Sequence, residues 1–556
     1  MPFNNQTRSS DFPDSMASRI ARIPNIVTVS SMFQNYSKFL GESLSILFFY
    51  ESHFSFKTLK GDTFSLILQI AHPFMKSLSL KSISYSSLFS FLVVFTLIQC
   101  SSDLNSEEEI TSVTLTFSIS GGGTLSLESG VYDLNSTINL VATPESGFYF
   151  DRWEGFESPI ELEEYTFSAT SDFAITAIFL PIPEVASEVV VYVPKKIDLN
   201  PIFMIKNGGN QAFLTDKIGN KLQTWNFSTK LGNEVKLLSD GNLMGLFKSE
   251  SVSFSFGGYG GILRKLTPTG ETLWEYEVNT ETELLHHDFE VLPNGNILLL
   301  IWERFNPQQA IALGYEGDGP IYLEKIIELN PNTFEIEWEW RSVDHLIQDS
   351  SPSRYNFGSI EDHPEKIDIN YDLNDTGDLM HANGLFYDTI RDVIYLSVNF
   401  YSEVWVIPHS YNTEVTKSEL GDLQFRFGNP STYGSLSERL FFNNHHPTLV
   451  EHDPTTRGNF LIYMNGTRDS QSVVYEFILP STFDSNPLNW NTPEEVWSFT
   501  HPDLFFGKIS GSYRLPNGNT LICEGDYGYW EVSRSGEIVW KYNGVGSTFW
   551  RGYVYP

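Results

Sequence analysis

A short motif recurs through the second half of the chain: an apolar run, a tight turn containing Gly-Asn, and a second apolar run. It occurs as VKLLSDGNLMGL (235–246), FEVLPNGNILLL (289–300), TLVEHDPTTRGNFLIY (448–463) and SYRLPNGNTLIC (512–523). Apolar strands on both sides of a glycine-containing turn are typical of β-hairpins, and Asn-Gly or Asp-Gly at the tip predicts a type I′ turn. This repeated hairpin constrains the fold more than any other feature.

A further strand pattern with tryptophan follows several of the hairpins, as in GETLWEYEV (270–278), FEIEWEWRS (334–342) and GEIVWKYN (536–543). The unit is therefore read as two hairpin strands followed by an outer strand. Successive turns are 54 residues apart between Asn242 and Asn296, and 60 apart between Asn459 and Asn519. Repeats of this length are typical of propeller blades, and the chain from residue 189 holds about six of them. The sequence predicts an all-β protein with a six-bladed β-propeller over residues 182–556.

Histidines stand at matching places in this repeat. His287 lies eight residues before the glycine of its turn, and His381 and His446 open the corresponding strands of two other units. Asn233 and Ser510 take this place in two further units. Because strand entries of a propeller converge on one end of the central channel, we expect the three histidines to form one site.

Converging histidines allow three interpretations. Three imidazoles suit Zn²⁺ or copper, but no His-x-His pair accompanies them, and we predict neither a metal nor another cofactor. One imidazole can instead act as a nucleophile while the others stabilise an anionic group in transfer. Histidines can also hydrogen-bond strand entries without any chemistry.

The charge and the cysteines narrow the function classes. The net charge is −34 at pH 7, which argues against a nucleic-acid partner, because phosphate binding needs a basic face. The two cysteines, Cys100 and Cys523, lie far apart in sequence. This excludes a disulfide framework and a thiolate metal site.

The N-terminal part contains an apolar run, LFSFLVVFTLI (88–98), preceded by basic residues and followed by Cys100. The run is too short to span a bilayer but has the length of a signal-peptide core. It resembles a bacterial lipoprotein signal. The resemblance implies a signal peptide over 75–99, a lipid anchor on Cys100, an acidic tether over 100–110, and a non-mature extension over 1–74. The protein would then be extracytoplasmic, on the periplasmic face of the outer membrane or on the cell surface.

Residues 111–181 predict a separate small β domain, because apolar and polar residues alternate in three runs between glycine turns. The domain resembles a short bacterial repeat found in cell-surface proteins. The matching residues are Gly122, Thr124, Ala142, Thr143, Pro144, Gly147, Phe150, Trp153 and Gly155. The resemblance implies a spacer or adhesive module, and Trp153 is expected in its core.

Several long stretches of the large region resemble the arylsulfotransferase family over about residues 200–545. They include HHDFEVLPNGNILLL, DLMHANGLFYDTIRDVIYLSVNFYSEVWVIPHS (378–410), LFFNNHHPTLVEHD and SGSYRLPNGNTLICEGDYGYWEVSRSGEIVWKY. The resemblance implies a six-bladed propeller that moves a sulfuryl group from a phenyl sulfate ester to a phenol without a nucleotide sulfate donor.

The same resemblance assigns roles. The family's Gln-His motif corresponds to His445-His446, which makes His446 the nucleophile and a sulfo-histidine the intermediate. Its His-x-Asn motif corresponds to His381 and Asn383, and its early histidine to His287. His381, His287 and Asn383 would hydrogen-bond the sulfuryl oxygens, or the histidines would protonate the departing phenolate.

Two residues depart from the family pattern. Asn399 stands where the family carries an arginine, and His445 stands in place of glutamine beside the nucleophile. Arg426, Arg468 or Arg514 could replace the missing cation. His286, His445, Asn383 and Asn399 are accordingly predicted to contact the substrate. The alternative function is a non-catalytic surface propeller that binds sulfated or aromatic ligands or glycans.

Overall fold

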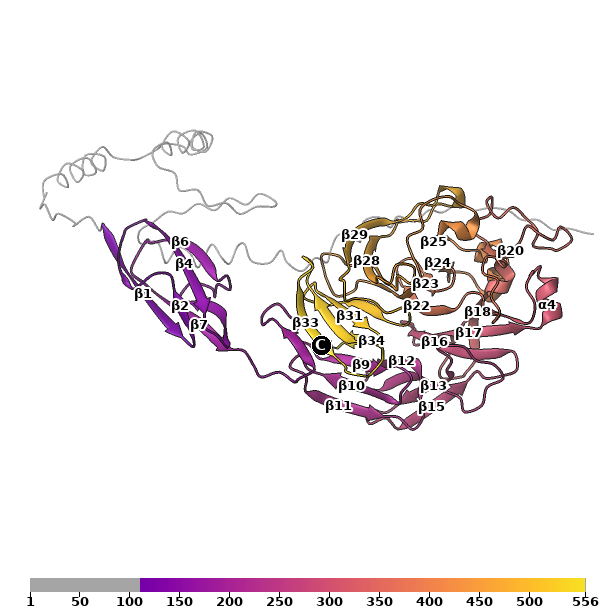
Figure 1. The fold of residues 1–556 in the computed structure, drawn as a ribbon, viewed down its shortest axis with the longest axis horizontal. Coiled ribbons are helices and arrows are strands. Elements are labelled where there is room, and N and C mark those ends of the chain that lie inside the picture. The colour runs from indigo at the N-terminus through magenta and orange to yellow at the C-terminus, as the bar shows by residue number, and fades with distance from the viewer. Residues whose placement is uncertain (1–110, 556) are drawn as a thin grey trace, which may run out of the picture. The chain divides into compact units, whose positions relative to one another are not determined.

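The structure, a computed structural model, describes residues 111–555 (Figure 1). β-Strands are the main regular structure of these residues, with short helices at α4 (Pro307–Ala312), α5 (Thr413–Thr416), η1 (Ser342–His345), η2 (Glu419–Gly421), η3 (Pro430–Tyr433) and η4 (Pro487–Asn489). The all-β prediction is therefore confirmed. None of the helices in this part of the chain has the length and apolar character needed to cross a membrane. The predicted extension, signal peptide, anchor residue Cys100 and acidic tether lie outside the described residues.

Residues 112–181 fold into two small sheets with strand orders β3-β1-β7-β5 and β2-β4-β6. The strands are β1 (Ser112–Ser120), β2 (Gly123–Leu125), β3 (Gly130–Asp133), β4 (Thr137–Pro144), β5 (Phe148–Glu154), β6 (Glu164–Ser168) and β7 (Phe173–Pro181). Alternate side chains face inward, so Leu115, Leu140 and Ala177 are buried. Trp153 is also buried, and its indole N–H donates to the carbonyl of Leu162 at 2.9 Å. Trp153 is therefore a core residue.

The large region begins at β8 (Val189–Tyr192) and ends at β34 (Phe549–Val554). The strands between them are β9 (Ile202–Lys206), β10 (Gln211–Thr215), β11 (Lys221–Asn226), β12 (Leu231–Leu237), β13 (Leu243–Lys248), β14 (Gly261–Leu266), β15 (Thr272–Glu277), β16 (Glu283–Val291), β17 (Ile297–Phe305), β18 (Ile321–Leu329), β19 (Ile336–Arg341), β20 (Leu346–Ile347), β21 (Ile367–Asp368), β22 (Ala382–Asp388), β23 (Val393–Val398), β24 (Glu403–Pro408), β25 (Phe425–Phe427), β26 (Asn444–Leu449), β27 (Phe460–Met464), β28 (Val473–Ile478), β29 (Glu494–Phe499), β30 (Gly511–Arg514), β31 (Thr520–Glu524), β32 (Gly528–Val532) and β33 (Ile538–Asn543).

Most of these strands belong to antiparallel sheets of four or five strands, which follow one another along the chain (Figure 1). The sheets are β34-β9-β10-β11, β12-β13-β14-β15, β16-β17-β18-β19, β22-β23-β24-β25, β26-β27-β28-β29 and β30-β31-β32-β33-β8. A short parallel pair, β20-β21, lies between the third and fourth of them in sequence.

The first strand of each sheet contacts the first strand of the next. These contacts run from β12 through β16, β22, β26, β30 and β34 back to β12, and we call these strands the inner strands. β34 comes from the end of the region but pairs with β9 from its beginning, with Tyr553 opposite Phe203. One sheet therefore combines both ends of the region and closes the ring of inner strands.

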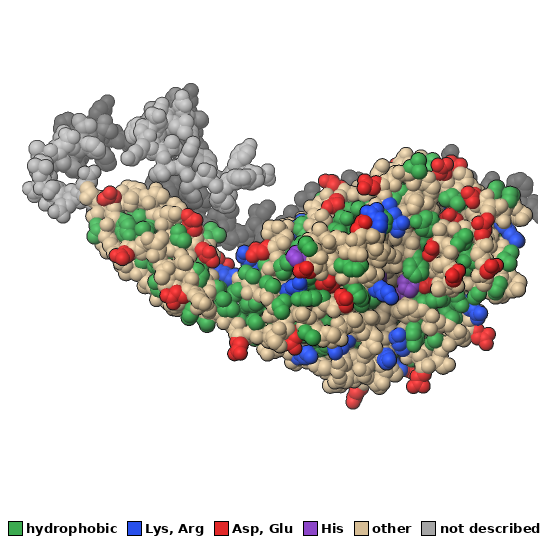
Figure 2. Space-filling model, viewed as in Figure 1, with side chains coloured by type: hydrophobic (Ala, Val, Ile, Leu, Met, Phe, Trp, Pro, Cys, Tyr) green, Lys and Arg blue, Asp and Glu red, His purple; other side chains and the backbone are tan. Residues whose placement is uncertain are grey.

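The core of this region lies between neighbouring sheets. Leu298 and Leu300 from β17 pack in one cluster with Leu396 from β23 and Trp405 from β24, and all four are buried. At the surface, acidic side chains are spread over the face shown in Figure 2, with Lys and Arg residues scattered between them. Burial of the apolar side chains in this cluster, which come from neighbouring sheets, holds adjacent repeats together.

Two details of the repeat differ from the sequence prediction. The units with a tryptophan strand contain one strand more than predicted, because β14, β18 and β32 lie between the hairpin and the tryptophan strands β15, β19 and β33, and β8 adds a fifth strand to the last of these sheets. β14 and β18 carry no tryptophan, and β32, which contains Trp530, has no Gly-Asn turn beside it, so the repeat motif did not mark these three strands.

The turn type is the second difference. At the tips, Gly241, Gly295 and Gly518 have φ of 81°, 87° and 86°, whereas the Asp or Asn before each glycine does not have positive φ. The N–H of Gly241 donates to the carbonyl of Leu238 at 2.9 Å, which closes a turn one residue earlier than a type I′ turn would. The type I′ prediction is therefore wrong, and the glycine forms a left-handed bulge after an ordinary turn.

Candidate active site

The repeat positions that carry the histidines share a backbone irregularity. Asn233, His287, His381, His446 and Ser510 have φ of 98°, 52°, 50°, 58° and 83°. The strand-pairing register shifts at or beside the first four of them. A left-handed residue in a strand makes a bulge and re-aims the neighbouring side chains. Positions that correspond in the sequence repeat therefore share a left-handed backbone conformation in the structure.

In β16 this bulge brings two neighbouring histidines into contact. Successive side chains of a regular strand point to opposite faces, but Nδ1 of His286 lies 2.9 Å from Nδ1 of His287. The His286 ring stacks on Trp302, with centroids 3.7 Å apart and planes inclined by 5°. Its Nε2 is 3.1 Å from Oε2 of Glu324, whose other oxygen accepts the N–H of Ala382 at 2.8 Å. Glu324, His286 and His287 thus form a continuous chain of polar contacts.

His381 lies against this pair and has a carboxylate of its own. Its ring centroid is 4.9 Å from that of His287, and it stacks on Phe400 at 4.7 Å. Nδ1 is 2.5 Å from Oδ2 of Asp378. Burial would lower the pKa of His381, but the charge and hydrogen bond of Asp378, helped by Glu324, raise it above the ordinary value. His381 is therefore the site histidine that holds a proton most readily.

His445 in β26 has a fixed tautomer. Its Nδ1 lies 2.6 Å from Oδ1 of Asn465. The amide nitrogen of Asn465 donates to the carbonyls of Phe506 and Ile509 at 2.8 and 3.0 Å, which identifies the side-chain oxygen. Nδ1 of His445 is therefore the donor, and the lone pair of the neutral ring is on Nε2. The ring centroid is 6.2 Å from Trp550.

His446 faces different neighbours. Its Nδ1 accepts the backbone N–H of Ser512 at 3.2 Å, and its ring centroid is 5.9 Å from Tyr553. The ring lies so close to Gly511 that a Cβ there would be 2.6 Å from Nδ1. In a neutral ring whose Nδ1 accepts, the proton is on Nε2. Among residues 111–555 no aromatic ring contact joins His446 to His287 or His381.

Four of the five imidazoles are kept neutral by their surroundings. Burial lowers the pKa of His445 to about 3 and lowers the pKa values of His286, His287 and His446 well below the ordinary value. Nearby positive charge, including that of Arg551, acts in the same direction on His287, His445 and His446. Neutral imidazoles retain the lone pair that nucleophilic attack requires.

The Nε2 atoms of four histidines have no partner within the described residues. His287, His381, His445 and His446 each make their side-chain hydrogen bond through Nδ1. These nitrogens come from β16, from the start of β22 and from β26, which follow one another in the ring of inner strands. The site can therefore present several ring nitrogens to one bound group.

The two predicted asparagines support the backbone beside His445. Nδ2 of Asn383 donates to the carbonyl of Asn444 at 2.7 Å, and Nδ2 of Asn399 donates to the same carbonyl at 3.1 Å. Asn399 also accepts from Asn443 at 2.9 Å. Asn383 Oδ1 is buried and has no protein partner in the described part of the chain. Asn399 thus holds the start of β26 in place.

The arginines that the sequence offered as replacement cations are engaged with carboxylates. The pairs are Arg426 with Glu403, Arg468 with Asp469, and Arg514 with Glu476. No hydrogen bond or ion pair joins them to the histidines within residues 111–555. Each of the three arginines is therefore neutralised by a neighbouring carboxylate rather than paired with a site histidine.

A buried arginine that the repeat did not reveal lies among the inner strands. Arg551 donates to Glu234 and Asp288 at 2.8 Å each, and to the carbonyl of Asn383 at 3.0 Å. It therefore ties β34 to β12, β16 and β22. The sequence signal was an arginine inside the alternating run FWRGYV (549–554), which has no Gly-Asn turn beside it.

The carboxylates at the site were also missed. Asp378 stands three residues before His381, and Glu324 interrupts the apolar run IYLEKIIEL (321–329). Both are buried. A carboxylate inside an apolar strand is costly unless it is paired, and this signal could have identified Glu324.

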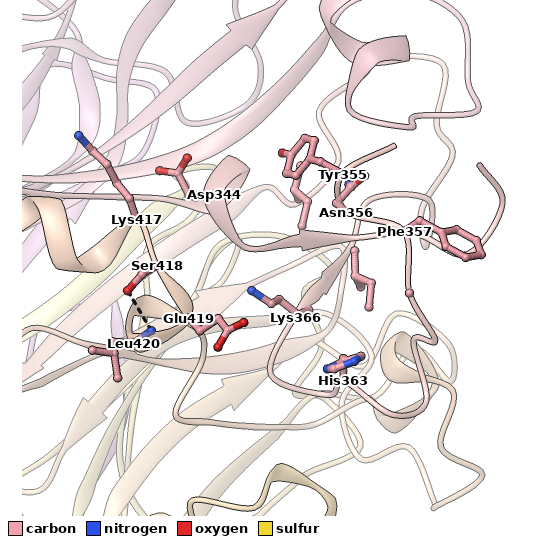
Figure 3. Close-up of a pocket in the computed structure, with 13 residues that line it drawn as sticks. Asp344, Tyr355, Asn356, Phe357, His363, Lys366, Lys417, Ser418, Glu419 and Leu420 are labelled. Atoms are coloured by element: carbon pink, nitrogen blue, oxygen red, sulfur yellow. Dashed lines mark hydrogen bonds between the residues drawn. The ribbon is translucent and has the colours of Figure 1, made fainter. Parts of the chain in front are cut away.

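Two observations concern other kinds of site. Within residues 111–555 no group of three His, Cys, Asp or Glu side chains is placed to hold a metal ion. A cavity of about 910 Å³ has a different lining, with Asp344, Tyr355, His363 and Lys366 around it (Figure 3). Lys366 pairs with Asp422 at 2.7 Å. None of the site histidines lines this cavity.

The fold and the site together define an all-β protein that carries a cluster of buried, mostly neutral imidazoles on successive inner strands. Residues 198–543, more than half of the chain, match the family described as arylsulfotransferase (ASST). The chain belongs to this family. Residues 113–183 match the divergent InlB B-repeat domain.

Solved structures show more distant likeness. A protein of unknown function from Bacteroides caccae is 12% identical, with 64% of this chain and 98% of that chain covered and a TM-score of 0.36. A periplasmic gluconolactonase from Pseudomonas aeruginosa is 12% identical, with 65% and 100% covered and a TM-score of 0.35. A β-propeller domain from Myceliophteria thermophila is 9% identical, with 66% and 89% covered and a TM-score of 0.34. Curated protein sequences gave no match.

Proposed function

We propose that the protein transfers a sulfuryl group from an aryl sulfate ester to a phenolic acceptor through a sulfo-histidine intermediate, without a nucleotide donor. The observation that carries this proposal is a set of Nε2 atoms that have no partner within residues 111–555 and lie on successive inner strands of an arylsulfotransferase-family chain. By analogy with phosphoryl transfer, sulfuryl transfer has a loose transition state with charge on the peripheral oxygens. It therefore needs a nucleophile and preorganised groups that stabilise negative charge.

We assign nucleophilic attack to His446, as the family motif implies. Its lowered pKa keeps the ring neutral. The hydrogen bond from Ser512 places the ring proton on Nε2, so attack by Nε2 requires the ring to release this contact and adopt the other tautomer. His445 is the second candidate nucleophile, because its contact with Asn465 already leaves the lone pair on Nε2.

We assign stabilisation of the transferring group to His381 and His287. His381 is protonated most readily, because Asp378 raises its pKa, and it supplies positive charge in a site where Asn399 replaces the family arginine. His287 contacts His381 and offers Nε2 to the sulfuryl or phenolic oxygen. Asn383 adds a buried acceptor oxygen, which suits a phenolic O–H. His286 and Asn399 act through the residues that they position.

We propose that the sheets between residues 182 and 556 are the blades of a six-bladed β-propeller. The order of the sheets along the chain and the closed ring of inner strands support this arrangement. Residues 111–181 would be a spacer before it. Limited proteolysis that releases a stable fragment starting near residue 182 would support the boundary, whereas cleavage inside the sheets would contradict it.

We propose that Cys100 carries a lipid anchor after removal of a signal peptide over 75–99, with 100–110 as a tether. This would hold the protein at the outer membrane, on its periplasmic face or the cell surface. Expression of the full chain and its Cys100→Ala variant in a bacterium, with a clickable fatty-acid label, tests this proposal. Label on the natural chain alone supports the anchor, and equal labelling or membrane retention of both contradicts it.

The activity is tested with nucleotide-free protein, 4-nitrophenyl sulfate and phenol. We expect release of 4-nitrophenol that depends on phenol and yields phenyl sulfate. Release without phenol would instead identify a hydrolase. Binding of aryl sulfates without any release would identify a non-catalytic binding protein.

A further inference from the structure

We propose that Glu324, His286 and His287 form a proton relay. Through it, Nε2 of His287 gives a proton to the departing phenolate and takes one from the incoming phenol. This inference rests on the proposed sulfuryl transfer and adds where the proton is kept between the two half-reactions. Glu324 and His286 are positioning residues that act through His287.

The geometry gives a single connected path. Oε2 of Glu324 is 3.1 Å from Nε2 of His286, and Nδ1 of His286 is 2.9 Å from Nδ1 of His287. Stacking on Trp302 fixes the plane of the His286 ring between these partners. The other oxygen of Glu324 is held by the N–H of Ala382 at 2.8 Å. Only Nε2 of His287 is left without a partner in the described residues.

Two protonation states satisfy every contact in this chain. In the first, Glu324 is ionised, His286 donates from Nε2 to Glu324, His287 donates from Nδ1 to His286, and Nε2 of His287 has a lone pair. In the second, Glu324 is protonated and donates to Nε2 of His286, His286 donates from Nδ1 to His287, and Nε2 of His287 carries a proton. The second state holds one proton more than the first.

The relay keeps positive charge off a buried ring. His381, His445 and Arg551 face His287 and, with burial, oppose its protonation as an imidazolium. Around Glu324 the facing groups are Asp378 and His381. Burial and the negative charge of Asp378 raise the pKa of the Glu324 carboxyl well above its ordinary value, so the carboxyl can store the proton while both rings stay neutral.

The half-reactions balance through these states. As the S–O bond of the donor breaks and the S–N bond to the attacking histidine forms, the phenolate takes the Nε2 proton of His287. Protons then move from His286 to His287 and from Glu324 to His286, which gives the first state. When the acceptor oxygen attacks sulfur and the S–N bond breaks, the phenolic proton enters at Nε2 of His287 and restores the second state.

The kinetic test is Glu324→Gln. A glutamine can keep the contacts with Ala382 and His286 but locks the chain with a proton on Nε2 of His287. We expect kcat for phenyl sulfate, whose leaving group needs a proton, to fall about 10²-fold, with KM nearly unchanged. With 4-nitrophenyl sulfate, whose phenolate leaves readily, and deuterated 4-nitrophenol as acceptor, transfer followed by mass spectrometry should fall by no more than about 5-fold.

The matched control is Glu328→Gln, a buried carboxylate four residues along the same strand that contacts Asn296 and His409. Glu328→Gln should change kcat by the same factor with both sulfate donors. A leaving-group-dependent loss in Glu328→Gln, or an equal loss with both donors in Glu324→Gln, would overturn the relay.

A measurement without turnover separates the relay from the proposed function. In the full chain with ¹⁵N-labelled histidine, the proton-bearing nitrogen should switch in His286 and His287 at one common pH. In Glu324→Gln both rings should keep the low-pH tautomer at every pH. If His287 becomes an imidazolium while His286 is unchanged, the relay is refuted. If the coupled switch occurs but no donor is turned over, the relay stands and the proposed sulfuryl transfer falls.

Discussion

The chain contains two His-His pairs at equivalent bulges, and they are used differently. In β16 the two rings contact each other and continue to Glu324. In β26 the rings diverge, because His445 donates to Asn465 and His446 accepts from the backbone of Ser512. The same dipeptide on the same backbone therefore gives one coupled pair and one pair of separate imidazoles.

The residues that follow the two pairs also differ in their contacts. Asp288 follows the first pair and is held by Arg551 at 2.8 Å and by the N–H of Leu385 at 3.0 Å. Pro447 follows the second pair, has no N–H to donate, and packs so closely to Gly384 that a Cβ there would be 2.8 Å away. Tautomers at such sites are decided by partners from other strands, and the sequence motif alone does not specify them.

The largest expected effect comes from removing the attacking group. His446→Gln should lower kcat/KM by on the order of 10⁴-fold, whereas His445→Gln should lower it by about 10-fold. Rapid quench with 4-nitrophenyl sulfate, followed by peptide mass spectrometry at alkaline pH, should locate the sulfuryl group on His446. A label on His445, with the larger loss in His445→Gln, would reverse the assignment.

Arg551 hydrogen-bonds Asp288 beside the first pair and should matter mainly for stability. Arg551→Met leaves Glu234 and Asp288 buried without their cation, which should lower the free energy of unfolding by about 3–5 kcal/mol. Urea denaturation followed by tryptophan fluorescence measures the change. Arg468→Met, at an exposed ion pair, is the control and should not shift the midpoint. If Arg551→Met shifted the urea midpoint as little as Arg468→Met does, the ion pairs of Arg551 would not be required for folding.

His381 lies beside the first pair and supplies the expected pH dependence. Its raised folded pKa keeps it protonated to higher pH than an ordinary histidine, so transfer should slow as pH rises through that value. Asp378→Asn removes the main cause of the raised pKa, which should move this fall to lower pH and reduce kcat/KM about 10²-fold near neutral pH.

The contact between His381 and Asp378 should also make stability depend on pH. Because the folded pKa of His381 is raised, its contribution is present below the unfolded pKa of histidine and is lost as pH rises through the folded value. Melting temperatures across this range measure it. If the pH profile of transfer were unchanged in Asp378→Asn, His381 would not be the residue that stabilises the charge of the transferring group.

The smallest effect is expected at Asn465, which accepts a hydrogen bond from His445. Asn465→Ala removes the acceptor of His445 Nδ1, and should lower kcat by about 3-fold if His445 only supports the site. A loss as large as that of His446→Gln would indicate that the fixed tautomer of His445 carries the reaction. Initial rates with 4-nitrophenyl sulfate at saturating phenol distinguish these outcomes.

The sequence was most informative where local chemistry decides structure. The repeated hairpins predicted an all-β chain, and counting from the turn glycines matched Asn233, His287 and Ser510, while His381 and His446 were matched by opening the corresponding strands; all five have positive φ in the structure. Such positions repeat because the same bulge is built from similar local sequence in each sheet.

The sequence was least informative where distant segments meet. Glu324 and His286 are 38 residues apart, and Ser512 and His446 are 66 apart, so no local pattern links them. Arg551 was missed for the same reason, because its strand lacks the turn motif and completes a sheet begun by residues near 202. The extra strands β14, β18 and β32 lacked a marker that separates them from their neighbours.

The pairing of β34 with β9 also sets an order of events during synthesis. The ring of inner strands cannot close before residues 549–554 have left the ribosome, because among the described residues no earlier segment fills that place in the sheet. Trp550, Arg551 and Tyr553, which contact the histidine cluster and its buried carboxylates, therefore arrive last. All of the site histidines are therefore synthesised before β34. The site can assemble only after synthesis has passed this strand.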